Sequence, residues 1–116
     1  MNKIAFIAVF LLVLSGFSRA GRLNVVASIP DLGDLARNIG GDKVKVKVLA
    51  TGREDLHAVP VRPSFIPILN RADLLLTLGL DAEHAWLPAL AAEARNARIM
   101  EDREGWHLLD LCVDRF

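Results

Sequence analysis

LNVVASIPDLGDLARNIGGDKVKVKV, from Leu23 to Val48, is the stretch that decides the fold. Its first part, Leu23 to Ile29, is rich in β-branched residues and stops at Pro30, which favours a strand. Asp31 is a candidate N-cap for a helix whose apolar residues recur at helical spacing until two glycines end it. Residues 43–48 then alternate lysine and valine, which predicts an edge strand with one charged and one apolar face. A strand, a helix and a second strand in this order predict a parallel pair with a right-handed crossover.

Two more strands and two more helices are expected farther along the chain. A helix is expected from about Pro63, with Pro67 in its first turn, where the amide donors are unpaired in any case. The run from Leu74 to Leu78 is short, continuous and apolar, as in a fully buried central strand. A helix is expected from Ala85 to Ala94, and a fourth strand is expected to begin at Arg98–Met100. The sequence therefore predicts an α/β fold with a parallel sheet flanked by helices on both faces.

Length and composition limit the classes of function. A chain of 116 residues suffices for one domain, and its hydrophobic fraction of 53% argues against disorder. The formal net charge of +0 gives no electrostatic reason to expect nucleic acid or an anionic membrane surface as a partner. Cys112 is the only cysteine, so we expect it to pack as a small apolar side chain without an internal disulfide. Residues 108–113 could add one short strand near the end of the chain.

Residues 1–20 have the layout of a secretory signal peptide. A lysine precedes the apolar run from Ile4 to Leu14, and small residues, Ser18 and Ala20, occupy the third-last and last positions. The apolar run is shorter than the ~20 residues that a spanning helix needs. A bacterial lipoprotein box would require a cysteine where Phe17 stands. We therefore expect cleavage after Ala20 and a mature chain in the periplasm or secreted.

Two loops that contain histidine follow the predicted second and third strands. GREDLHAVPVRPS, residues 52–64, contains His57, and GLDAEH, residues 79–84, contains His84. Open parallel sheets bind ligands at the carboxyl ends of their strands, and first-row divalent metals accept imidazole and carboxylate ligands. The carboxylates in these loops are Glu54, Asp55, Asp81 and Glu83. The two histidines form neither an HxxxH nor an HxH pair, so the pattern leaves metal ligands and solvated surface residues both open.

An enzymatic function has little support in the sequence. Glu54, Asp55 and His57 could do acid–base chemistry, but no nucleophile motif and no phosphate-binding loop accompanies them. We therefore expect a binding protein and not an enzyme.

Three blocks of sequence carry a family resemblance. They are VVASIPDLGDLARNIGGDKVKV, a histidine loop that ends in RPS, and NRADLLLTLGLDAEHAWLPAL, in this order between about Leu23 and Ile99. Together they resemble the N-terminal lobe of the periplasmic zinc and manganese substrate-binding proteins of ABC transporters. The resemblance implies two α/β lobes joined by a long helix, with the metal in the cleft between them.

The resemblance also implies that His57 is a metal ligand. The family's loop usually reads Asp-Pro-His, then an acidic residue three positions on, then Pro-Ser. Asp55, His57 and the pair at residues 63–64 match by position, whereas Leu56 replaces the proline and Pro60 replaces the acidic residue.

The resemblance implies that residues 21–116 form one incomplete lobe and that the second lobe is absent. The expected function is an exported component of an ABC-type uptake system, with zinc or manganese as the bound ion and an inner-membrane permease as partner. His57 and His84 are fewer than the about four ligands of a zinc site. The alternative is therefore an interaction module or degenerate fragment that docks on a partner chain without binding metal.

Overall fold

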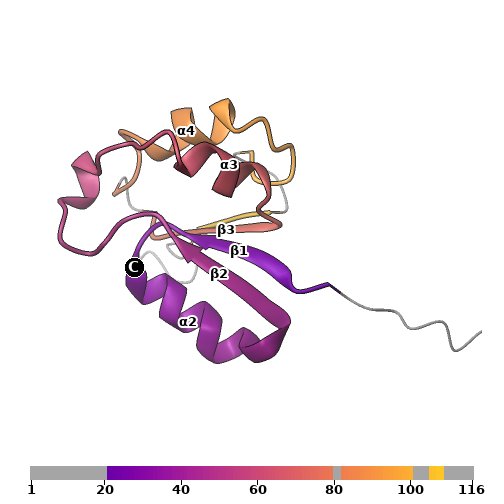
Figure 1. The fold of residues 1–116 in the computed structure, drawn as a ribbon. Coiled ribbons are helices and arrows are strands. Elements are labelled where there is room, and N and C mark those ends of the chain that lie inside the picture. The colour runs from indigo at the N-terminus through magenta and orange to yellow at the C-terminus, as the bar shows by residue number, and fades with distance from the viewer. Residues whose placement is uncertain (1–20, 80–81, 101–104, 109–116) are drawn as a thin grey trace, which may run out of the picture.

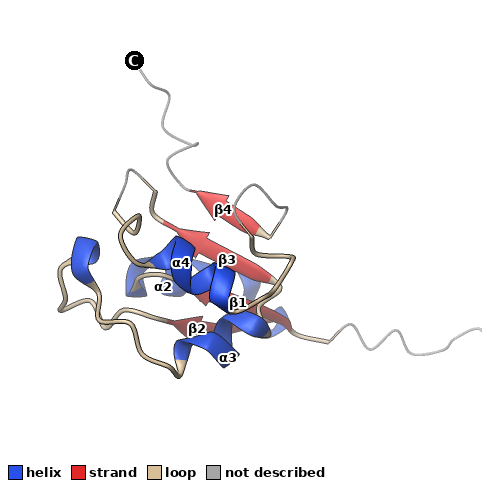
Figure 2. Cartoon of the chain, turned by 90° about the horizontal axis from the view of Figure 1, so that it is seen from above, coloured by secondary structure: helices blue, strands red, loops and turns tan. Residues whose placement is uncertain are grey.

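The sheet of this protein is parallel throughout. The computed structural model describes residues 21–79, 82–100 and 105–108. Its four strands are β1 (Leu23–Ala27), β2 (Val44–Val48), β3 (Leu74–Thr77) and β4 (Trp106–Leu108), and their order in the sheet is β2-β1-β3-β4 (Figures 1 and 2). This confirms the α/β fold that the sequence predicts.

Helices lie on both faces of the sheet. Helix α2 (Pro30–Gly40) covers one face, and α3 (Phe65–Asn70) and α4 (Leu87–Glu93) cover the other (Figure 1). Two short 3-10 helices, η1 (Gly41–Lys43) and η2 (Leu56–Ala58), lie in the connections that precede and follow β2. None of the helices in the described ranges is long and apolar enough to span a membrane.

The ends of α2 differ in how well the sequence predicts them. The helix begins at Pro30 with Ile29 in the N-cap position, so the prediction that Asp31 caps it is wrong. Proline suits the first helical position because its fixed φ is already helical and its missing N–H would be unpaired there. At the other end Gly41 has φ 54° and donates its N–H to the carbonyl of Arg37, which confirms the glycine terminator.

The edge position of β2 is confirmed as well. Its valines are half-buried and its lysines, Lys45 and Lys47, are exposed on the opposite face. Helix α2 crosses the valine side so closely that a Cβ on Gly33 would lie 2.5 Å from Cγ2 of Val48. Glycine is therefore what allows α2 to reach the sheet at this point.

Strand β3 is internal but is not fully buried, contrary to the prediction. Leu75 and Thr77 are buried, whereas Leu74 and Leu76 are half-buried. These two leucines pair in register with residues of β1 whose side chains face α2, so they share that face. Helix α2 packs mainly on β1 and β2 and leaves the β3 half of this face partly open.

The predicted strand at Arg98–Met100 is wrong. These residues form turns, and Ile99 is fully buried. Asn96 causes the turn, because its Oδ1 accepts from the backbone N–H of Arg98 and its carbonyl accepts from that of Ile99. The fourth strand is instead Trp106–Leu108, which pairs with β3.

The predicted helix Ala85–Ala94 is shorter in the structure, where α4 runs from Leu87 to Glu93. Residues 1–20, Asp81 and Cys112 lie outside the described residues, and so does the possible strand at 108–113 except for Leu108.

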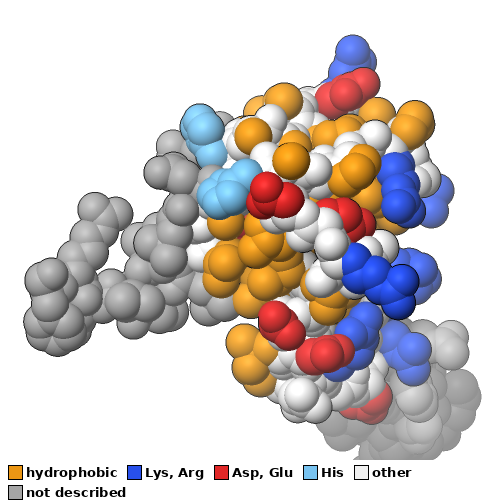
Figure 3. Space-filling view, turned by 90° about the vertical axis from the view of Figure 1, so that its left-hand side faces the viewer, with side chains coloured by type: hydrophobic (Ala, Val, Ile, Leu, Met, Phe, Trp, Pro, Cys, Tyr) orange, Lys and Arg blue, Asp and Glu red, His pale blue; other side chains and the backbone are white. Residues whose placement is uncertain are grey.

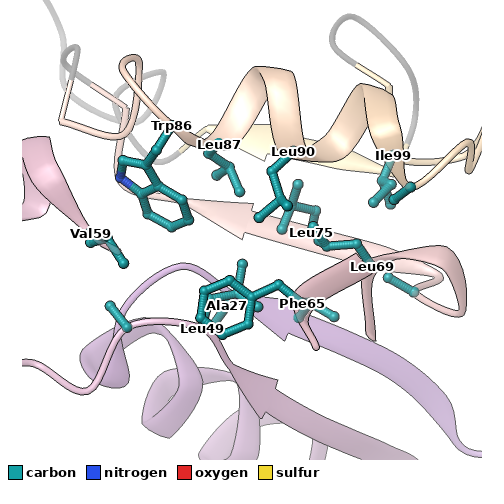
Figure 4. Packing of buried hydrophobic residues seen from close by; sticks show 14 of the residues in the cluster. Ala27, Leu49, Val59, Phe65, Leu69, Leu75, Trp86, Leu87, Leu90 and Ile99 are labelled. Carbon is teal, nitrogen blue, oxygen red and sulfur yellow. The ribbon is translucent and has the colours of Figure 1, made fainter. Parts of the chain in front are cut away.

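The main hydrophobic core fills the space between the sheet and the pair α3 and α4, and the same cluster extends to the α2 side, where it includes Ala27 and Leu32 (Figure 4). Trp86 is 5% exposed and packs in this core beside the first residue of α4. The other labelled members are Ala27, Leu49, Val59, Phe65, Leu69, Leu75, Leu87, Leu90 and Ile99. Val59 belongs to the loop after β2, so the core extends to the carboxyl ends of the strands.

Candidate metal-binding site

The carboxyl ends of β1, β2 and β3 share one edge of the sheet because the strands are parallel. His57 lies in the loop that leaves β2, and His84 lies in the loop that leaves β3. Figure 3 shows this side of the molecule, where histidine side chains gather at one margin, with acidic side chains near them and a broad apolar patch. We call the two loops, residues 49–59 and 78–86, the histidine rim.

His57 is presented by a 3-10 turn that its own neighbour stabilises. Asp55 is the N-cap of η2, and its Oδ1 accepts from the backbone N–H of His57 at 3.0 Å. The carbonyl of Asp55 also accepts from the N–H of Ala58 at 2.9 Å. Asp55 and His57 are both exposed, so the imidazole is open to a ligand while the carboxylate holds the turn.

Glu54 is engaged with the backbone of the same loop. Its Oε2 accepts from the N–H and the hydroxyl of Thr51, at 2.9 Å and 2.7 Å, and from the N–H of Arg53 at 3.2 Å. The Thr51 hydroxyl is the main cause that lowers the pKa of the Glu54 carboxyl, because hydrogen-bond donors favour its charged form. Glu54 therefore shapes the loop rather than offering a free carboxylate.

Glu83 has a structural role that the sequence pattern does not predict. Its side chain is buried, and its carboxylate accepts from the Ser28 hydroxyl at the end of β1. The same carboxylate accepts from the N–H groups of Leu78 and Gly79, at 2.7 Å and 3.1 Å. Glu83 thus joins the loop after β3 to the end of β1 and satisfies donors that burial would otherwise leave unpaired.

Trp86 joins the two histidine loops. Its indole Nε1 donates to the carbonyl of Leu56 at 2.8 Å, one residue before His57. His84 precedes Trp86 by two residues and is exposed. The indole therefore fixes the turn that carries His57 against the segment that carries His84.

The described residues of the rim supply two imidazoles for a metal ion, those of His57 and His84. Among the described residues, no three His, Cys, Asp or Glu side chains lie close enough together to hold a metal ion. The sequence correctly places both histidine loops at one edge. The sequence does not predict that Glu54, Asp55 and Glu83 accept hydrogen bonds from backbone or hydroxyl donors. A carboxylate near a histidine in the sequence is compatible both with a metal ligand and with such a structural role.

Comparison with known proteins identifies the family. The sequence model of the family described as zinc-uptake complex component A, periplasmic (ZnuA), matches residues 25–111. The chain belongs to the ZnuA family. This confirms the resemblance that the three sequence blocks carry.

Relatives of this ZnuA-family chain are metal transport proteins by name. It is 28% identical over 109 residues to the manganese ABC transporter substrate-binding lipoprotein ScaA of Streptococcus gordonii, with 82% of this chain and 35% of the relative covered. It is 28% identical over 118 residues to the manganese ABC transporter substrate-binding lipoprotein PsaA of Streptococcus pneumoniae, with 90% and 37% covered. The chain thus spans about a third of the length of these relatives.

Solved structures agree on the fold. A crystal structure of ZnuA superposes with a TM-score of 0.62 at 27% identity, and the match covers 82% of this chain and 34% of that one. The periplasmic zinc-binding protein TroA of Treponema pallidum superposes with a TM-score of 0.59 at 28% identity, covering 67% and 28%. The fold of this ZnuA-family chain therefore corresponds to part of larger metal-binding proteins.

Proposed function

We propose that this chain is the metal-binding component of an ABC-type uptake system for zinc or manganese, and that it binds and does not catalyse. Membership of the ZnuA family and the names of the manganese-transporter relatives support this proposal. In the proposal residues 1–20 are a cleaved signal peptide, residues 21–116 are an N-terminal lobe, and the partner is a membrane permease. The periplasmic family and the lipoprotein relatives support a location outside the cytoplasm.

The link between the two histidine loops is the observation that carries the metal proposal. His57 and His84 are exposed, and the Trp86 hydrogen bond to Leu56 holds their loops together at the edge where parallel sheets bind ligands. A neutral imidazole is a good ligand for zinc and for other first-row divalent ions. We propose His57 as the first ligand and His84 as the second.

Two imidazoles are half of the about four ligands of a zinc site. Water or further protein groups must complete the coordination, so we expect this chain alone to bind zinc weakly. Binding should weaken in acid, because protons compete with the metal for imidazole nitrogen.

Calorimetric titration of the purified protein with zinc and with manganese tests the proposal. We expect saturable binding that His57→Ala abolishes and His84→Ala weakens. His107→Ala is the matched control, because the backbone of His107 belongs to β4 and not to either loop of the histidine rim. Equal heats for the wild-type protein and His57→Ala would contradict the assignment of His57.

A second candidate function is an interaction module without metal. It rests on apolar side chains that α2 and its sheet face leave exposed: Leu23, Leu35 and Ile39 are 43%, 45% and 79% exposed. Surfaces of this kind mark contact sites when they are contiguous. If this function holds, Leu35→Ser with Ile39→Ser should abolish self-association in light scattering or binding of a hydrophobic dye. A monomeric wild-type protein that binds no dye would eliminate this candidate.

A further inference from the structure

A hollow of about 180 Å³ lies on the sheet face opposite α2, between the β2 edge and α3. Its apolar lining includes Val26 of β1 together with Pro67 and Ile68 of α3. Lys45 and Lys47 border it from β2, and Arg71 borders it from the residue after α3. Two separate parts of the chain thus contribute cationic residues to the lining of one largely apolar depression, away from the histidine rim.

The three cations lack acidic partners within the described residues. The ion pairs there join Arg37 to Asp34 and Arg98 to Asp73. Asp73 lies two residues after Arg71, but its carboxylate is occupied by Arg98 and by the backbone N–H of Asn24. The lining of the hollow contains no carboxylate. The potential in the hollow is therefore positive and not neutralised locally.

Ordinary structural reasons account for part of this charge. Lysines on an edge strand discourage pairing with another chain, which explains why β2 carries them. Arg71 is the C-cap of α3, where a cation interacts favourably with the helix dipole. Neither reason requires that cations of β2 and α3 border the same hollow, or that apolar side chains line it.

The size of the hollow and its lining indicate the class of ligand that fits it. A cavity of about 150 Å³ lined by apolar side chains accommodates a benzene ring. A ring or branched hydrocarbon of that size would pack on Val26, Pro67 and Ile68, and a carboxylate on it would meet the cations at the border. An inorganic anion would lack the contacts with the apolar lining, and a neutral hydrocarbon would lack the attraction to the cations.

We propose that this hollow is a binding site for a small organic carboxylate with a hydrocarbon body about the size of a benzene ring. The site is separate from the proposed metal site. Lys45 and Lys47 stand in register with Asn24 and Val26 of β1, whereas the histidine loops leave the carboxyl ends of β2 and β3.

An NMR titration of the purified protein with benzoate tests the proposal, with benzamide, acetate and inorganic phosphate as comparison ligands. We expect saturable shifts in the backbone signals of Val26 and Ile68 with benzoate. The dissociation constants of the comparison ligands should be at least about tenfold higher, since each lacks either the charge or the ring.

Variants that remove the charges provide the second arm of the test. Lys47→Gln and Arg71→Gln should each weaken benzoate binding, and the double variant should abolish it. All these side chains are exposed, so the fold should persist. Lys43→Gln in η1 is the matched control, because Lys43 does not line the hollow, and it should bind like the wild type. No saturation with benzoate, equal affinity for benzamide, or full affinity in the double variant would each overturn the proposal.

Discussion

The indole Nε1 of Trp86 donates a hydrogen bond of 2.8 Å to the carbonyl oxygen of Leu56. The two residues are 30 positions apart in sequence and belong to the loops that follow β2 and β3, the strands on either side of β1. The bond makes the position of the His57 turn depend on the packing of Trp86 in the core. The buried indole of Trp86 therefore holds the histidine rim in place, although both histidines are exposed.

Trp86→Phe should loosen the turn that carries His57. Phenylalanine keeps most of the packing but removes the N–H, so the Leu56 carbonyl loses its partner. We expect a loss of about 1 to 2 kcal/mol in the free energy of unfolding. Hydrogen exchange at the Ala58 amide, which bonds to Asp55 within the turn, should accelerate more than exchange in β1. Unchanged exchange at Ala58 would show that the turn is held by other contacts.

Glu83→Gln should destabilise the protein more than Ser28→Ala. The glutamine has one carbonyl oxygen where the carboxylate has two, and its amide group would face backbone donors. We expect a loss of about 2 to 3 kcal/mol for Glu83→Gln, and about 1 kcal/mol for Ser28→Ala, which removes a single bond to the carboxylate. Chemical denaturation of both variants measures the two losses. A larger loss for Ser28→Ala would contradict the role assigned to the Glu83 carboxylate.

Gly33→Ala should destabilise the contact of α2 with β2. The added methyl group would lie 2.5 Å from Cγ2 of Val48, and the resulting overpacking exceeds the helix propensity gained from alanine. We expect a net loss of about 1 to 2 kcal/mol in thermal or chemical unfolding. In a Val48→Ala background the same substitution should be neutral or stabilising. Equal losses in both backgrounds would exclude the steric explanation.

The charge of Glu54 should contribute to stability only above the acid range. Its pKa in the folded protein is lowered from the ordinary value of 4.5, first by the Thr51 hydroxyl. The unfolded state thus binds the proton more readily, so the stabilisation is present above pH 4.5 and is lost as the pH falls through the lower folded pKa. Thr51→Val should raise the pKa toward 4.5 in a carboxyl NMR titration. Arg53→Gln keeps the backbone N–H that donates to Glu54, so this variant should leave the pKa of Glu54 unchanged.

The sequence predicts those parts of the fold that depend on local patterns. Alternation in residues 43–48 correctly indicates the edge strand, and paired glycines mark the end of α2. The predictions are wrong where contacts between residues that are distant in sequence determine the conformation or the burial of a segment. Arg98–Met100 looks like a strand, but the buried Asn96 side chain turns the chain there, and Leu74 and Leu76 are apolar without being fully covered.

The same distinction applies to the site. The positions of His57 and His84 follow from the order of strands and loops, and the structure puts both loops at one edge. The bonds of Glu83 to Ser28 and of Trp86 to Leu56 join residues 55 and 30 positions apart. No local pattern indicates such pairs, because the separations depend on how three parallel strands align.

The most direct test of the metal proposal is a zinc titration of the purified protein followed through the imidazole nitrogen signals of its histidines. We predict that signals of His57 and His84 shift together and reach saturation at the same zinc concentration, while those of His107 stay in place. Such a result would mean that the two loops of the histidine rim share one ion. Shifts of His57 and His84 at different zinc concentrations, or no saturable shift of His57, would contradict a shared metal site.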